Sequence, residues 1–291
     1  MNWHPQAYHV AFCLGKIKGF YKAEGIDLKI IPGRGEATTS SLISADENGF
    51  GVLSASYLLK AKLKKMPITA VSGLFQRDLM GIYYRKSAGI KDPSDLAGKT
   101  VFTSRASKAE YLLLFLEQQN LGKKVKVRYT SGGSLQTDLD LFLNNRADAV
   151  AATCFQDMYE KKNPNPADVG LFCFDAYGSK LITIMLIAND KMIARDPELV
   201  RRFVRATNKS WAYSMKHPEE AVKAFLVRYP DLQYEEELRC FKRILPYILS
   251  HDKKLGYMSR QDWEEIKKLL LKTGGLEADV DVSRAYTNRF Q

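Results

Sequence analysis

The sequence is poor in the residues that build metal and redox sites. It contains 4 cysteines and 4 histidines among 291 residues. No two cysteines stand at CxxC spacing, and no pair of histidines forms an HExxH motif. We therefore expect no metal site and no dithiol redox site. We also expect the four cysteines to be free and mostly buried thiols: Cys13, Cys154, Cys173 and Cys240.

Long hydrophobic runs are absent as well. The longest candidate, Leu181–Ala188, has the length of a strand, whereas a membrane helix needs about 20 apolar residues. The chain opens on residues Met1–Pro5 without the charged and apolar regions of a secretory signal. Two locations follow as expectations. The protein is cytoplasmic if Met1 is the native start, and periplasmic or membrane-anchored and extracytoplasmic if a signal was removed.

Positive charge is in excess, with 44 Lys and Arg against 33 Asp and Glu and a net charge of +11. Such a balance suits an anionic partner, a membrane surface or nucleic acid. The basic clusters at 60–65 and 123–128 lack the aromatic or recognition-helix signatures of nucleic-acid-binding modules. We interpret them as solvated faces and do not expect nucleic acid as a partner. A serine nucleophile is not expected either, because no GxSxG motif is present.

Helical and strand patterns alternate over the first 188 residues. At about 150 residues per domain, the length suggests two domains. After residue 190 the pattern is almost purely helical. The sequence therefore predicts an α/β protein with parallel-leaning sheets, followed by a helical C-terminal layer. The expected strands are 26–30, 50–53, 67–74, 80–85, 99–103, 125–129, 147–152, 169–174 and 181–188, and the main expected helices before residue 190 are 10–21, 38–44, 55–64, 108–119 and 134–144.

Three stretches carry a resemblance to a known family. They are Asn2–His9 continuing into Lys18–Leu28, then Leu143–Ala149, and finally Asn189–Ala221. In this order and spacing they resemble the extracytoplasmic solute-binding proteins of ABC importers for thiamine-pyrimidine precursors and sulfonates. That family shares its fold with fungal thiamine-pyrimidine synthase. The resemblance covers essentially the whole chain.

The resemblance implies a type II periplasmic-binding-protein fold, in which two α/β lobes are joined by a double-crossing hinge. Lobe one would be residues 1–84 plus 182–291, and lobe two would be the inserted residues 85–181. Composition breaks near 84–87 and 178–181 fall at the same two places. A binding protein of this kind closes its hinge around a ligand held between the lobes. No heptad or strand-edge signal for assembly is present, so we expect a monomer.

The synthase that shares the fold differs at two informative positions. In that enzyme a lysine holds pyridoxal phosphate, and a histidine four residues later supplies pyrimidine atoms. The matching positions here are Leu53 and Tyr57, which can neither form a Schiff base nor donate an imidazole. Lys180–Ile187 stands where the synthase has a cysteine-rich run. We therefore expect that the chain is not an enzyme and has no cofactor. The alternative is a pyrimidine synthase-like enzyme of thiamine biosynthesis.

The expected function is capture of a small heterocyclic or anionic solute and its transport to an ABC transporter permease. A thiamine precursor-like pyrimidine, another heterocycle, a sulfonate and a carboxylate all remain open as the solute. A pyrimidine-binding member would offer a carboxylate from the strand that ends near Ala152. Thr153 occupies that place, which weakens a thiamine-precursor ligand, and Glu36 and Asp157 are the substitutes that the sequence offers.

Candidate ligand-binding residues follow the predicted strand ends, where loops meet helix N-termini. Trp3 and His9 could stack on a flat heterocycle, although ordinary packing is the alternative. The Ser104–Ser107 turn suits an anion, because Arg105 offers a planar guanidinium beside two hydroxyls, although a simple helix cap is the alternative. The full expected set is Trp3, His9, Gly35, Glu36, Ser54, Ser56, Tyr57, Phe75, Gln76, Ser104, Arg105, Ser107, Thr153 and Tyr177.

Overall fold

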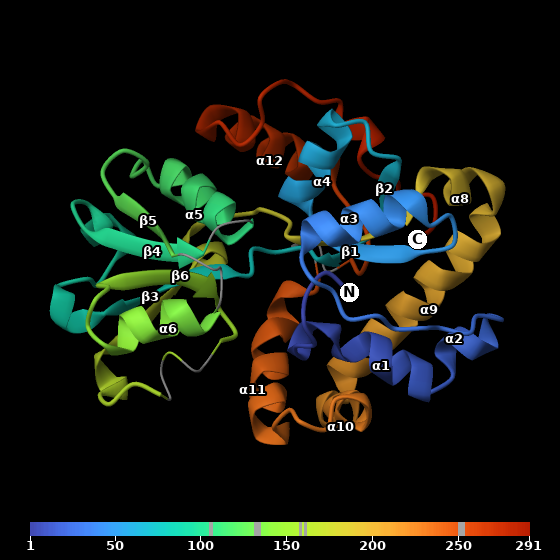
Figure 1. The fold of residues 1–291 in the computed structure, drawn as a ribbon, viewed down its shortest axis with the longest axis horizontal. Coiled ribbons are helices and arrows are strands. Elements are labelled where there is room, and N and C mark those ends of the chain that lie inside the picture. The colour runs from blue at the N-terminus through green and yellow to red at the C-terminus, as the bar shows by residue number, and fades with distance from the viewer. Residues whose placement is uncertain (105–106, 131–134, 157–158, 160–161, 250–253) are drawn as a thin grey trace. The chain divides into compact units, whose positions relative to one another are not determined.

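The computed structural model describes residues 1–104, 107–130, 135–156, 159, 162–249 and 254–291 (Figure 1). The chain divides into two compact units. Unit 1 comprises Met1–Arg77, Ile182–Lys267 and Ala278–Gln291, and unit 2 comprises Asp78–Leu181 and Lys268–Glu277. The observed first crossing therefore follows Arg77, whereas the sequence analysis placed it after residue 84. The strand at 80–85 belongs to unit 2 because it pairs with two other strands of that unit.

Unit 1 has a three-stranded sheet in the order β1-β8-β2. The strands are β1 (Phe50–Ser54), β8 (Ile184–Asn189) and β2 (Ile68–Phe75), and β8 runs antiparallel to both neighbours. The expected parallel-leaning arrangement is therefore wrong for this sheet, because β8 returns from unit 2 and enters between β1 and β2 in the opposite direction. As a result β1 and β2 end at the same edge, where Ser54 and Phe75 both lie opposite Ile184.

Helices cover both faces of this sheet, with α3 and α9 on opposite sides of β1 (Figure 1). The ring of Phe50 stacks on Phe203 of α9 with centroids 3.7 Å apart, and Phe75 meets Trp211 at 5.3 Å. Asp196 caps α9 by accepting a hydrogen bond from the Leu199 amide. The helices are η1 (Ala7–His9), α1 (Val10–Ile17), α2 (Phe20–Ala23), α3 (Glu36–Ala45), α4 (Ala55–Leu63), α8 (Asp190–Arg195), α9 (Pro197–Lys216), α10 (Pro218–Arg228), α11 (Tyr234–Ile244), η6 (Leu245–Tyr247), α12 (Arg260–Thr273) and η7 (Val282–Arg284). The boundary between Lys267 and Lys268 falls within α12.

The segment Ile26–Ile30 does not form the strand expected from its alternating pattern. Its alternation does describe burial, since Ile26, Leu28 and Ile30 are less exposed than the residues between them. Other groups take the backbone bonds that a strand partner would make. The carbonyl of Leu28 accepts from Lys16 Nζ at 2.5 Å, and that of Ile30 accepts from an Arg228 guanidinium nitrogen at 2.7 Å.

Unit 2 has a five-stranded sheet in the order β5-β4-β6-β3-β7. Its strands are β4 (Thr100–Ser104), β5 (Lys126–Thr130), β6 (Ala149–Thr153), β3 (Met80–Arg85) and β7 (Val169–Cys173). Strand β4 is parallel to β5 and β6, whereas β3 is antiparallel to β6 and β7. The helices α5 (Ser107–Gln118) and α6 (Leu135–Leu143) cover opposite faces (Figure 1). The described part of the unit also contains the short helices η2 (Lys86–Ala88), η3 (Pro93–Leu96), η4 (Pro166–Asp168) and η5 (Phe174–Tyr177).

A disulfide joins Cys154 to Cys173, so the expectation of four free thiols is wrong for this pair. The strand register explains the pairing. Thr153 lies opposite Met80 and Cys173 lies opposite Gly81, so that the ends of β6 and β7 flank the start of β3. The other two cysteines, Cys13 and Cys240, take no part in this disulfide.

Within the described ranges, none of the helices combines the length and the apolar character needed to span a bilayer.

Candidate functional site

Two helices of unit 1 begin at the edge where β1 and β2 end. Helix α4 starts directly after Ser54, whose Oγ accepts a hydrogen bond from the Tyr57 amide at 3.2 Å. The Ser54 amide donates to Oε1 of Glu36, the first residue of α3, at 2.5 Å. The start of α3 and the start of α4 are thus tied together. Helix N-termini carry backbone N–H donors and partial positive charge, which suit an anion or a carbonyl oxygen.

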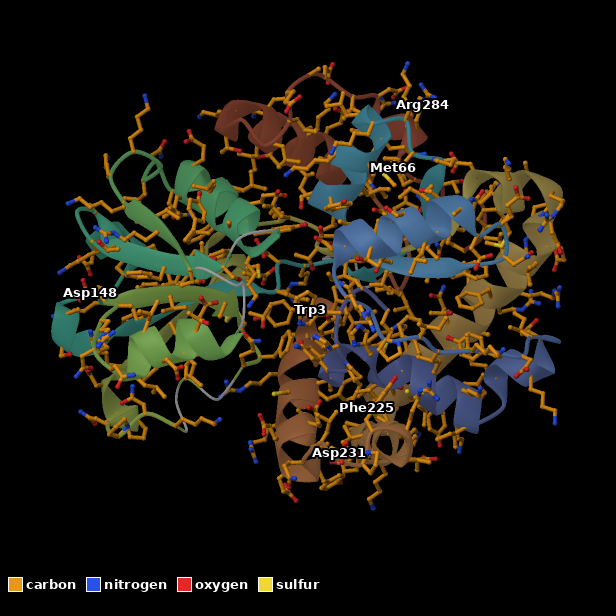
Figure 2. The ribbon with its side chains drawn as sticks, viewed as in Figure 1. Trp3, Met66, Asp148, Phe225, Asp231 and Arg284 are labelled. Atoms are coloured by element: carbon orange, nitrogen blue, oxygen red, sulfur yellow. A yellow bond between two sulfur atoms is a disulfide. The ribbon has the colours of Figure 1, made fainter. Side chains whose placement is uncertain are left out.

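The N-terminal segment is held against the loop that precedes α3. The amide of Gly33 donates to the Trp3 carbonyl at 3.0 Å, and the amide of Gly35 donates to the Asn2 carbonyl at 2.9 Å. A Cβ at position 33 would lie 2.2 Å from the Met1 carbonyl oxygen, so only glycine allows this approach. Gly35 has a φ of +114°, which also favours glycine. Trp3 is left 39% exposed (Figure 2).

A buried polar cluster lies behind Trp3. Asn2 Oδ1 is 3.2 Å from His9 Nε2 and accepts from the Tyr8 hydroxyl at 3.3 Å. The Tyr8 ring lies 4.0 Å from the His9 ring and 6.2 Å from the Phe75 ring, measured between centroids. Burial holds the pKa of His9 well below its usual range. Burial and the charge of Glu36 raise the pKa of Tyr8. Both rings are therefore uncharged hydrogen-bonding groups at neutral pH.

The structure brings several predicted residues of unit 1 to this edge. Ser56 Oγ lies 3.2 Å from Ser54 Oγ, and the Tyr57 hydroxyl accepts from Ser40 at 3.4 Å. Phe75 is fully buried in the core, and the Gln76 side chain donates to the Lys254 carbonyl at 2.8 Å. Asn2 was not among the predicted residues, although it opens the first stretch that carries the family resemblance.

The predicted residues of unit 2 also follow the ends of strands. Ser104, Thr130 and Thr153 end β4, β5 and β6 at one edge, because the three strands run in the same direction. Tyr177 ends η5, which follows β7, and its ring is 36% exposed and meets Phe172 at 5.3 Å. Ser107 is the first residue of α5. The prediction for Arg105 lies outside the described residues.

One carboxylate at this edge was missed by the sequence analysis. Asp138, in the first turn of α6, is fully buried, and its Oδ1 accepts a hydrogen bond from Thr130 Oγ1 at 2.7 Å. Burial raises the pKa of Asp138, while Thr130 and the charge of Lys108 oppose the rise. An acidic residue in an amphipathic helix is usually a solvated surface group, so the pattern gave no warning of its burial.

A hollow of about 430 Å³ lies at the opposite edge of the unit 2 sheet, where β3 ends and β6 and β7 begin. Arg85, Asp148 and Asp168 are among its lining residues, and Asp148 is labelled in Figure 2. Its polar groups already bind one another. The Asp168 carboxylate accepts from the Ser87 amide and hydroxyl, each at 2.7 Å. Ligands of α/β sheets gather instead beyond the carboxyl ends of strands, which is where Ser104 and Thr153 lie.

Across the described parts of the chain, no group of three or more His, Cys, Asp or Glu side chains is arranged to hold a metal ion.

Comparison with solved structures defines the class of fold. A Candida albicans protein described as having the generic periplasmic binding protein fold matches with a TM-score of 0.70, at 13% identity over 99% of this chain and 95% of its own. The ligand-binding component of an ABC-type import system from Staphylococcus aureus, solved with zinc bound, matches with a TM-score of 0.73, at 10% identity over 99% and 96%. The chain has the type II periplasmic-binding-protein fold, as expected.

Sequence comparison then shows the family. The model of the family described as NMT1/THI5 like matches residues 6–221. The chain belongs to this family. Among its curated relatives is a 4-amino-5-hydroxymethyl-2-methylpyrimidine phosphate synthase of Saccharomyces cerevisiae, 25% identical over 285 residues that span 91% of this chain and 79% of the relative.

The expectation that the chain is not an enzyme is contradicted by this relationship, because the yeast relative is named as a synthase. The expectation rested on Leu53, on Tyr57 and on the missing cysteine-rich run at Lys180–Ile187. Leu53 is fully buried in β1 opposite Met185, and Tyr57 lies in the first turn of α4. The similarity to the synthase, in contrast, extends over nearly the whole chain.

Proposed function

We propose that this chain captures a small heterocyclic or anionic solute and presents it to the permease of an ABC importer. The observation that carries the proposal is the edge of unit 1, where two helix N-termini meet an exposed tryptophan. Trp3 offers a ring for stacking, and the start of α3, which has no side-chain cap, offers backbone donors. The similarity to a ligand-binding component of an ABC-type import system supports the same use of the fold.

The site chemistry favours a flat ring with polar substituents over a purely aliphatic solute. A heterocycle on Trp3 would gain roughly 0.5–1.5 kcal/mol from stacking beyond its buried area. Glu36 and the uncharged Tyr8 add acceptor and donor atoms at the same edge of unit 1. A thiamine-type pyrimidine and another heterocycle both meet these conditions, and a sulfonate or carboxylate would use the backbone donors alone.

An extracytoplasmic location is part of this proposal. The bond between Cys154 and Cys173 supports it, because disulfides persist in oxidising compartments and are rare in the cytosol. The protein can be isolated in the presence of a thiol-alkylating reagent and its modified cysteines identified by mass spectrometry. Two cysteines should be alkylated, Cys13 and Cys240. Four alkylated cysteines would point to a reducing compartment and argue against delivery to an importer.

Pyrimidine synthesis is the second candidate function, and the yeast relative is the observation that favours it. The pyridoxal phosphate that the sequence resemblance associates with a synthase does not fit the residues at the matching positions. Leu53 presents a buried aliphatic side chain where an amine is required. A synthase activity of this chain would therefore rest on residues other than Leu53.

A binding measurement combined with an activity assay separates the two candidates. Native mass spectrometry of the purified chain should reveal a bound small molecule, and calorimetric titration should show binding of 4-amino-5-hydroxymethyl-2-methylpyrimidine or of methanesulfonate. Capture is supported when the solute binds and is recovered unchanged. Formation of the pyrimidine phosphate by the chain would favour the synthase. A chain that binds neither probe and carries no molecule would overturn the capture proposal.

A further inference from the structure

Three buried polar atoms at the carboxyl edge of unit 2 have no hydrogen-bond partner among the described residues. They are Oδ2 of Asp138, the hydroxyl of Tyr159 and Oγ1 of Thr153. Asp138 and Tyr159 are both fully buried. Buried polar atoms are nearly always paired, because losing water without gaining a partner costs free energy. Three unpaired atoms in one region therefore point to a partner that the described residues do not supply.

Neighbouring contacts hold these groups in place. The Tyr159 ring stacks on Tyr83 with centroids 4.6 Å apart and meets the edge of Phe142 at 5.7 Å. The Tyr83 hydroxyl donates to the Thr153 carbonyl at 3.5 Å, which ties Tyr159 to the end of β6. After burial, the charge of Asp138 is the next cause that raises the pKa of Tyr159. Phe142 stands one turn after Asp138 on α6, so the Tyr159 ring packs against the face of the helix that carries the carboxylate.

A cation in the same region forms no ion pair with the described residues. Lys108, in the first turn of α5, is half-buried, and none of the ion pairs found in the described part of unit 2 includes it. Burial lowers the pKa of Lys108, whereas the charge of Asp138 opposes that change. Lys108 and Thr153 are partly exposed, whereas Asp138 and Tyr159 are fully buried. We call Lys108, Asp138, Thr153 and Tyr159 the unit 2 polar cluster.

We propose that the unit 2 polar cluster binds the amino-bearing edge of a nitrogen heterocycle. Asp138 Oδ2 is an acceptor in need of a donor, which an exocyclic amino group supplies. The Tyr159 hydroxyl and the Lys108 ammonium are donors, which suit a ring nitrogen or a hydroxymethyl oxygen of the same molecule. A sulfonate or a simple carboxylate would instead meet the Asp138 carboxylate, and like charges repel.

This inference rests on the proposed function and names the part of the chain that selects its solute. It also supplies the carboxylate that the sequence analysis sought at the end of β6 and did not find, because Thr153 stands there. Asp138 comes from α6 and reaches the same edge through its bond to Thr130 at the end of β5.

The test compares two probes on matched variants of the full chain. The probes are 4-amino-5-hydroxymethyl-2-methylpyrimidine and the analogue that has hydrogen in place of the amino group. The wild type should prefer the amino probe by about tenfold or more. Asp138→Asn, which keeps the size of the side chain and can still accept from Thr130, should lose most of that preference. Asp140→Asn, on the same helix but exposed, is the control and should behave like the wild type.

Tyr159→Phe separates binding from folding. The variant keeps the stacked ring and removes a hydroxyl that has no partner among the residues that the structure describes, so its melting temperature should stay the same or rise. Its affinity for the amino probe should nevertheless fall several-fold. A loss of affinity together with an undiminished melting temperature is a result that a purely structural role for Tyr159 does not produce.

The outcomes distinguish this inference from the proposed function. If the wild type binds the amino probe and all three variants bind it equally well, the polar cluster is not the selective site, while capture of the solute still stands. Tighter binding of methanesulfonate than of the amino probe, improved further by Asp138→Asn, would show an anion site and overturn the inference. If the wild type binds neither pyrimidine nor methanesulfonate, both proposals fail.

Discussion

The carboxyl edges of the two sheets differ in how their polar groups are satisfied. In unit 1, Asn2, His9 and Ser54 each bind another residue of the same unit. In unit 2, Asp138, Thr153 and Tyr159 each keep an atom without a partner in the described residues. The first edge is a completed scaffold that presents a ring and two helix ends. At the second edge, the unpaired polar atoms lack hydrogen-bond partners, which a ligand would supply. The comparison predicts that mutations of the bonded groups at the first edge damage folding, whereas mutations of the unpaired groups at the second edge damage binding.

The largest effect is expected where the scaffold of unit 1 leaves no space. Gly33→Ala would place a Cβ 2.2 Å from the Met1 carbonyl oxygen and 2.3 Å from the Asn2 carbonyl carbon. Two backbone segments would have to move apart, at a cost of about 3 kcal/mol in the free energy of unfolding. Urea denaturation of the variant measures this cost. Gly19→Ala is the control, because its Cβ would meet no atom within 4 Å and only its φ of +73° is unfavourable. Equal losses for the two variants would show that the N-terminal segment is not held tightly.

A pH-dependent effect of intermediate size is expected at Asp78. Like Asp138 it is a buried carboxylate of unit 2, but both of its oxygens accept hydrogen bonds. Asp78 accepts from Ser179 Oγ at 2.6 Å and from the Met80 amide at 3.0 Å. Burial raises its pKa from 3.8 to about 7 in the folded chain. The folded state therefore binds a proton more tightly than the unfolded state between pH 4 and 7, and this group lowers stability as pH rises through that window.

Asp78→Asn removes this penalty while its side chain can keep both hydrogen bonds. At pH 8 the variant should be more stable than the wild type by about 1–3 kcal/mol, and the gain should shrink toward pH 4. Denaturation curves at pH 4.5, 6 and 8 give the comparison. A gain that is the same at all three values would mean that Asp78 does not carry the pH dependence.

Much of the fold follows from patterns that are local in the sequence. The strand over Met80–Arg85 was predicted to the residue, and the helices near 36–45 and 55–63 were displaced by only one or two residues. Segment Ile26–Ile30 has the strand pattern but pairs with no strand, because Lys16 and Arg228 take its carbonyl bonds. Side chains from distant segments decided that outcome, and no local pattern contains them.

The candidate site, too, could be predicted only where local patterns in the sequence determine it. Residues that follow strand ends, such as Ser54 and Thr153, could be selected from the sequence because the strands themselves were predictable. Asp138 could not, since its burial depends on α6 packing over the sheet and on Thr130 coming from another strand. The pairing of Cys154 with Cys173 likewise depends on β3 lying between β6 and β7.

The smallest effect is expected at Trp3, and it tests whether the edge of unit 1 also takes part in binding. Because the side chain is 39% exposed, Trp3→Ala should change the melting temperature little. Affinity for the amino probe should fall by roughly 0.5–1.5 kcal/mol, or about two- to tenfold, through the lost stacking. Trp3→Phe should recover part of the affinity, and Ile17→Ala, another exposed apolar residue of unit 1, should leave it unchanged. If Trp3→Ala binds the probe as tightly as the wild type, the edge of unit 1 is scaffold only, and recognition rests on unit 2.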